Sequence, residues 1–130
     1  MMQMKRALLV AAASVALGGL AYGGTKYVQP VYIDLGAQYA YGSMGSARNS
    51  VDSTQYIACS FATQASGVTG YCQARDANGT NASCFFSNNL NHEKALMGMT
   101  ADARIFFMWK PDGSCDYIQI YAASMYEPKK

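Results

Sequence analysis

The residues Val68–Phe86, VTGYCQARDANGTNASCFF, carry the clearest structural signal in the chain. Asn78-Gly79 lies near the middle of this stretch, and this dipeptide is a strong signal for a hairpin turn between antiparallel strands. We therefore expect one strand over Val68–Asp76 and a second, returning strand over Ala82–Phe86. Along the first strand, two small residues are expected on one face and three larger residues on the other: Cys72 and Ala74 against Tyr71, Gln73 and Arg75.

Two further strands have strong apolar patterns. Arg104–Lys110 is apolar at both odd and even positions, which is typical of a strand that is central in a sheet or covered on both sides. Pro111-Asp112-Gly113 then predicts a tight turn. The next segment, Cys115–Ala122, alternates, and its inward and outward side chains are expected to be Ile118, Ile120 and Ala122 against Tyr117, Gln119 and Tyr121.

The remaining strands are weaker. Gln55–Phe61 is expected to place three side chains on one face, namely Ile57, Cys59 and Phe61. Lys26–Leu35 contains Pro30, which cannot donate to a sheet ladder, so this segment is expected to be an edge strand or a broken one.

One helix and two irregular segments complete the expected fold. Asparagines that can cap a helix precede an apolar pattern near residues 89–99, which predicts one short helix there. The polar tract Gly42–Thr54 is expected to be a loop, and the tail Ser124–Lys130 to be frayed or paired at a sheet edge. Several short strands joined by turns predict an all-β fold, an antiparallel sandwich or small barrel.

The N-terminus has the layout of a secretory signal peptide. Lys5 and Arg6 precede the apolar run Ala7–Leu17, and small residues follow, with cleavage expected after Ala21 or as late as residue 24. The run is shorter than the roughly 20 apolar residues that span a bilayer. We therefore expect residues 1–21 to be removed and residues 22–130 to form one exported domain, secreted or periplasmic, without a membrane span. The alanine-rich segment is more typical of a bacterial than of a eukaryotic signal.

Charge excludes a nucleic-acid partner. The chain has 10 Lys and Arg against 8 Asp and Glu, and removal of Lys5 and Arg6 leaves the two signs equal. A protein that neutralises phosphates needs a basic surface. Only Lys129-Lys130 is locally basic, so neither nucleic acid nor an anionic lipid surface is expected as a partner.

The four cysteines predict two disulfides, because an even number in a small exported chain is typical of an oxidising compartment. Cys72 lies symmetrically with Cys59 about the Gln64–Gly67 turn, and with Cys84 about Asn78. We favour Cys72–Cys84 with Cys59–Cys115, because the long second loop would constrain the unfolded chain more. Cys59–Cys72 with Cys84–Cys115 is the alternative.

Metal and redox chemistry are not expected. A zinc site needs closely spaced ligands, but the chain has no C-x-x-C pair and a single histidine, His92. A redox-active cysteine pair needs the same close spacing. We therefore expect structural disulfides, no metal and no cofactor.

Catalysis is not expected either. His92 stands beside Glu93 and Lys94 and is predicted to be solvated, and no G-x-S-x-G motif is present. Asp112 and Asp116 flank a predicted turn, where aspartate is favoured for turn geometry alone. The chain is therefore predicted not to be an enzyme.

Tyrosines offer a candidate binding face. Tyr39 with Tyr41, and Tyr117 with Tyr121, are spaced so that each pair points to one side of its strand. Such rings can stack on sugars or fill pockets of a protein partner. The favoured interpretation is that cross-strand tyrosine pairs stabilise the sheet. Trp109 is expected in the core.

Three functions remain open. The favoured hypothesis is a non-enzymatic binding domain for an unknown protein or glycan. The second is a structural subunit of a surface fibre or matrix that self-associates through the Pro30-containing strand or the tail. The third is a secreted hydrolase inhibitor that presents a disulfide-held loop such as Ala77–Thr80. Asn78 and Asn81 match the N-glycosylation pattern and are expected to be unused.

Overall fold

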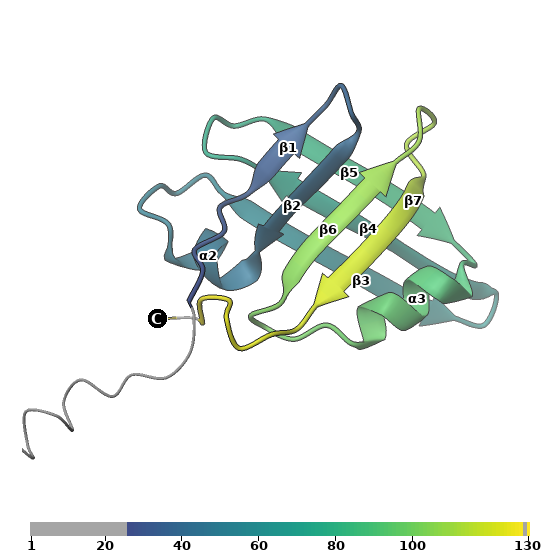
Figure 1. Ribbon diagram of the computed structural model, residues 1–130. Coiled ribbons are helices and arrows are strands. Elements are labelled where there is room, and N and C mark those ends of the chain that lie inside the picture. Colours follow the sequence, from purple (N-terminus) through teal and green to yellow (C-terminus); the bar gives the residue numbers. More distant parts are fainter. Residues whose placement is uncertain (1–25, 129) are drawn as a thin grey trace, which may run out of the picture.

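A computed structural model describes residues 26–128 and 130, and it confirms an antiparallel β fold built as a two-layer sandwich. The strands of one sheet cross those of the other at a steep angle (Figure 1). The four-stranded sheet has the order β1 (Tyr32–Asp34), β2 (Tyr39–Ser43), β6 (Arg104–Trp109), β7 (Cys115–Tyr121). The three-stranded sheet has the order β3 (Tyr56–Gln64), β4 (Gly67–Arg75), β5 (Asn81–Ser87), and the described helices are α2 (Met44–Asn49) and α3 (Leu90–Met97).

The predicted hairpin is the pair β4 and β5, which stay in register from Thr69 opposite Ser87 to Arg75 opposite Asn81. Gly79 has a φ of 85°, a conformation that glycine adopts without a steric penalty. The Asp76 carboxylate accepts hydrogen bonds from the backbone N–H groups of residues 78 and 80 and closes the turn. The local signal therefore produced the predicted structure.

The N-terminal strand lies at a sheet edge, as predicted, and the C-terminal tail is paired with the N-terminal segment. β1 is a three-residue edge strand that begins two residues after Pro30. The C-terminal tail is paired rather than frayed, because the Tyr27 N–H donates to the Met125 carbonyl at 2.7 Å. The side chain of Asn49 also donates to the Pro128 carbonyl at 2.7 Å. The tail is thus bound to the N-terminal segment and to α2.

The core lies between the sheets and is densest around β6. Ile105 and Phe107 on the inner face of β6 are fully buried, together with Ala40 from β2 and Cys72 from β4. Gly70 makes room for this packing, because a Cβ at this position would clash with the Phe86 ring. Close packing of this kind leaves little tolerance for added or removed atoms.

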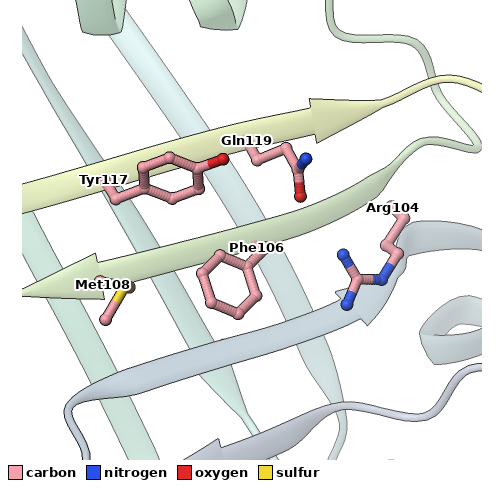
Figure 2. A pocket seen from close by; sticks show the side chains of 5 residues that line it. All are labelled: Arg104, Phe106, Met108, Tyr117 and Gln119. Carbon is pink, nitrogen blue, oxygen red and sulfur yellow. The ribbon is translucent and has the colours of Figure 1, made fainter.

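The prediction that β6 is central in its sheet or covered on both sides is confirmed by the first alternative, because β6 lies between β2 and β7. Its outer side chains Arg104, Phe106 and Met108, drawn in Figure 2, are half-buried. No described helix or strand lies over this face (Figure 1). Apolar residues on both faces therefore reflect an aromatic outer surface rather than a third layer. The expectation that Ala122 points inward is wrong, because this residue lies beyond the end of β7 and is exposed.

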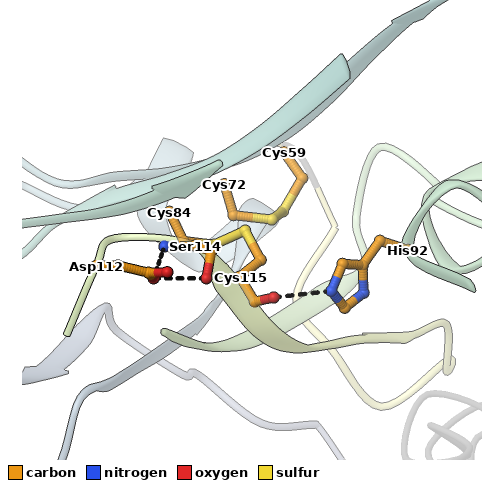
Figure 3. The surroundings of a disulfide bond; sticks show 7 residues. All are labelled: Cys59, Cys72, Cys84, His92, Asp112, Ser114 and Cys115. Atoms are coloured by element: carbon orange, nitrogen blue, oxygen red, sulfur yellow. Dashed lines mark hydrogen bonds between the residues drawn. A yellow bond between two sulfur atoms is a disulfide. The ribbon is translucent and has the colours of Figure 1, made fainter. Parts of the chain in front are cut away.

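The favoured disulfide pairing is also wrong, and the bonds are Cys59–Cys72 and Cys84–Cys115 (Figure 3). Cys72 on the central strand lies opposite both Cys59 and Cys84, as the turn symmetry predicted. The start of β7 lies beside β5, where the Phe85 N–H donates to the Gly113 carbonyl. Cys115 therefore meets Cys84, and Cys72 is left to Cys59. Native strand order, rather than loop length in the unfolded chain, decides the pairing.

The segment expected to be the Gly42–Thr54 loop contains the end of β2 and the helix α2, so there are two described helices rather than one. Ser43 caps α2, because its hydroxyl accepts a hydrogen bond from the Ser46 N–H at 3.1 Å. Gly45, Ser46 and Ala47 are buried. The small polar residues that suggest a loop are in fact small because they are packed against the sheet and the tail.

Helix α3 confirms the predicted helix, but the expectation for His92 is wrong. Asn89 caps the helix by accepting from the His92 N–H at 3.0 Å. The His92 imidazole is buried, because it faces inward with Leu96 one turn later. Its Nε2 lies 3.0 Å from the Cys115 carbonyl oxygen (Figure 3). The His92 ring also meets the Phe86 ring edge-on.

Neither described helix is long and apolar enough to cross a bilayer. The predicted signal peptide, residues 1–21 with cleavage as late as residue 24, lies outside the described residues.

Candidate binding surface

The outer face of the four-stranded sheet carries six aromatic side chains. We call these six residues, together with Arg104 and Met108, the aromatic face. Alternation along each strand points these residues outward, and strand register brings them together. Tyr32 on β1 lies opposite Tyr41 on β2, which lies opposite Phe106 on β6. The aromatic members are Tyr32, Tyr39, Tyr41, Phe106, Tyr117 and Tyr121.

Most rings of the aromatic face touch one another. The ring centroids of Tyr32 and Tyr41 are 5.3 Å apart, and Tyr39 is 5.7 Å from Phe106. Phe106 meets the Tyr117 ring edge-on at 5.8 Å. Contacts in this range can stabilise a sheet, which is the role that the sequence interpretation favours for the tyrosine pairs.

The rim of the aromatic face nevertheless stays open to solvent. Tyr32, Tyr117 and Tyr121 are 46%, 46% and 44% exposed. Partial burial raises the pKa of the Tyr39 phenol above its usual value, and the neighbouring Tyr32 and Asp34 reinforce the shift. An apolar surface with a rim of hydroxyl groups can bind a ligand that is itself partly apolar and partly polar.

Arg104 is the one cation of the aromatic face. Its guanidinium lies 4.9 Å from the Tyr41 ring centroid and 5.8 Å from that of Phe106, within the range of a cation–π interaction. Its Nε donates to the Gln29 side-chain oxygen at 2.6 Å. Within residues 26–128 and 130, no carboxylate forms an ion pair with it.

Two shallow hollows meet at Arg104. The first, of about 400 Å³, lies over β6 and β7 and is lined by Arg104, Phe106, Met108, Tyr117 and Gln119 (Figure 2). The second, of about 350 Å³, is lined by Tyr27, Val28, Gln29, Arg104, Met125 and Tyr126. The Tyr126 ring contacts Tyr121 edge-on at 5.6 Å. The aromatic face thus continues past Arg104 onto the tail.

The outer face of the other sheet differs in composition. Its outward side chains are mostly small and polar, for example Ser60, Thr69 and Ser83. Tyr71 and Phe85 are its two exposed aromatic residues, 44% and 59% exposed. The exposed aromatic side chains are therefore more numerous on the outer face of the four-stranded sheet than on that of the three-stranded sheet.

The sequence located part of this surface. Tyr39, Tyr41, Tyr117 and Tyr121 all lie on the aromatic face, but β6 separates the first pair from the second. Sequence reasoning missed Tyr32, Phe106, Met108 and Arg104. The alternation of Arg104, Phe106 and Met108 is a usable signal for this face, but a strand that is apolar on both faces equally fits one that is covered on both sides.

The other candidate residues lie elsewhere. Asn78 is exposed at the β4–β5 turn, and the Asn81 side chain accepts a hydrogen bond from Arg75 at 2.8 Å. Hydrogen bonds from the Ser114 hydroxyl and amide lower the pKa of Asp112, and Asp116 lies 4.0 Å from the Lys110 ammonium. Trp109 is half-buried against the core.

No group of three potential metal-ligating side chains (His, Cys, Asp or Glu) occurs among the described residues. In three comparisons, the chain matched no family model, no curated protein and no solved structure.

Proposed function

We propose that this chain is an exported, non-enzymatic binding domain that holds its ligand on the aromatic face. The observation that carries the proposal is a continuous set of rings and one arginine on an open sheet, with no described element over it. Contiguous exposed apolar surface on a soluble domain is typical of an interaction site. Tyr, Phe, Met and Arg are also the residues enriched where proteins contact partners.

The compartment supports this function. Two disulfides and the absence of a free cysteine among the described residues suit an oxidising environment outside the cytoplasm. The predicted signal peptide would direct the chain there, into the periplasm of a bacterium or beyond. The burial of His92 and its contact with the Cys115 carbonyl support a structural rather than a catalytic role for this histidine.

The test compares two tyrosines of nearly equal exposure on opposite faces. Tyr117→Ser removes a ring from the aromatic face, and Tyr71→Ser removes a matched ring from the other sheet, 46% against 44% exposed. Binding of the mature protein and of each variant is measured on isolated cell envelopes of the producing organism and on a panel of neutral and acidic polysaccharides. We expect Tyr117→Ser to lose binding and Tyr71→Ser to keep it. Equal behaviour of the two variants, or no binding to any probe, would overturn the proposal.

Assembly into a fibre is a second candidate function, but the two segments that the sequence suggested for self-association are not the ones that favour it. The N-terminal segment and the tail pair with each other through Tyr27 and Met125. The longest edge strand described is instead β3, which has nine residues without charge, proline or a register shift. Its outer edge forms no backbone hydrogen bond within the described part of the chain. Such an edge can pair with another strand.

Light scattering without reductant tests assembly. Multimers that Ala62→Lys on β3 converts to monomers would support this candidate, and a monomeric wild-type protein would exclude it. The inhibitor hypothesis loses its premise, because hydrogen bonds to Asp76, rather than a disulfide across β4 and β5, hold the Ala77–Thr80 turn.

A further inference from the structure

Arg104 donates to Gln29, whose backbone is tied to two buried serines. Ser43 and Ser46 are almost fully buried, and the Ser43 hydroxyl donates to the Ser46 hydroxyl at 2.7 Å. The Ser46 hydroxyl accepts from the Gln29 N–H at 2.9 Å, and the Gln29 carbonyl accepts from the Ser43 N–H at 3.0 Å. Gln29 in turn binds the Nε of Arg104. The guanidinium is therefore fixed in position rather than extended freely into solvent.

The fixed guanidinium still has donors to offer. An arginine side chain has five N–H groups, of which Gln29 engages the one on Nε. No other described side chain or backbone carbonyl accepts a hydrogen bond from it. The remaining N–H groups form a planar fork, the geometry that binds a carboxylate through two parallel hydrogen bonds.

None of the ion pairs among residues 26–128 and 130 includes Arg104. β1 contributes one carboxylate to this sheet face, that of Asp34. Asp34 lies opposite Tyr39 at one end of β2, whereas Arg104 lies opposite Ser43 at the other end. Asp34 is also engaged, because it accepts the Ala37 N–H at 2.8 Å. A half-buried cation without a carboxylate partner favours an anionic group on the ligand.

The shape of the surface indicates what carries that anionic group. The hollows on the two sides of Arg104 are shallow and adjoining, so a ligand that fills both lies across the sheet as a chain. Sugar rings have apolar C–H faces and hydroxyl edges, which match the tyrosine rings and their hydroxyl groups. A protein interface of standard size takes about 20–30 residues a side, more than the aromatic face and the second hollow supply.

We propose that the ligand is an acidic polysaccharide, whose rings lie on the aromatic face and whose carboxylate binds the Arg104 guanidinium. This inference rests on the proposed function and deepens it. Gln119, which lines the first hollow, can bind sugar hydroxyl groups beside the carboxylate.

The probe is polygalacturonate, a uniformly carboxylated polymer, compared with the same polymer after its carboxyl groups have been reduced to alcohols. Arg104→Gln keeps a polar side chain without the charge. Arg75→Gln is the matched control, because Arg75 also donates its Nε to an amide oxygen and lies 5.3 Å from a tyrosine ring, on the opposite sheet. We expect the mature protein to bind the carboxylated polymer at least about tenfold more tightly than the reduced one. Arg104→Gln should lose this preference, and Arg75→Gln should keep it.

The outcomes separate this inference from the function on which it rests. Equal binding of the two polymers, abolished by Tyr117→Ser, would overturn the acidic ligand and leave a binding domain for neutral glycans. The purified protein could also bind neither polymer while Tyr117 is protected from chemical labelling in its native surroundings. That result would overturn the acidic ligand and favour a protein partner. The two-polymer comparison on the wild-type protein remains decisive if Arg104→Gln fails to fold.

Discussion

Removal of the Cys84–Cys115 disulfide is expected to cost more stability than removal of Cys59–Cys72. Cys84–Cys115 closes a loop of 31 residues and joins β5 to β7 across the two sheets, whereas Cys59–Cys72 closes 13 residues within one hairpin. In the loop-entropy model these lengths correspond to about 3.7 and about 2.9 kcal/mol. The expected difference between the two variants is therefore about 0.8 kcal/mol.

The assay is urea unfolding of Cys84→Ala/Cys115→Ala and of Cys59→Ala/Cys72→Ala, followed by fluorescence of the single tryptophan, Trp109. Alanine is the replacement because all four cysteines are buried. A smaller loss for the first variant than for the second would refute the reasoning. Detection of a Cys72–Cys84 peptide in a non-reducing digest would refute the pairing itself.

Three further predictions concern the fold. Hydrogen bonds from the side chain and amide of Gln55 and from the Thr54 amide lower the pKa of Asp52 from 3.8 to about 2. The stabilisation from the ionised carboxylate is present above pH 4 and lost as the pH falls toward 2. Asp52→Asn should therefore lower the urea midpoint at pH 7, and the difference in midpoint between variant and wild type should shrink in acid. Phe107→Ala should lower the free energy of unfolding by about 3–5 kcal/mol, because the ring is fully buried; a loss below about 1 kcal/mol would contradict its place in the core. Gly45→Ala should release the tail, because the added methyl group clashes with the Glu127 carbonyl; faster hydrogen exchange at the Tyr27 amide measures this, and unchanged exchange would refute it.

The elements that the sequence predicts well are those with local causes. Asn78-Gly79 and the Asp76 carboxylate form the β4–β5 turn from neighbouring residues. The Asn89 side chain likewise caps α3 three residues away. Such interactions depend on short segments, so a reading of the residues alone can identify them.

The features that the sequence misses depend on residues far apart in the chain. Gly45 in α2 packs against the carbonyl of Glu127, and the small residues of α2 resemble a loop until that contact is known. The disulfides depend on the position of β7 beside β5. Each tyrosine pair could be assigned to a strand face, but β2 pairs with β6 across about half of the chain. The sequence alone therefore could not predict that these rings and Arg104 lie on one continuous surface.

The most direct test of the aromatic face as the binding surface is tyrosine nitration, mapped by mass spectrometry. The purified protein is compared with the protein labelled in its native setting, among the producing cells and their medium. Tyr32 and Tyr117 on the aromatic face and Tyr71 on the opposite sheet have nearly equal exposure, 46%, 46% and 44%. We predict that Tyr32 and Tyr117 react less in the native setting, while Tyr71 reacts equally in both. Equal reactivity of all three in the two settings, or protection confined to Tyr71, would contradict it.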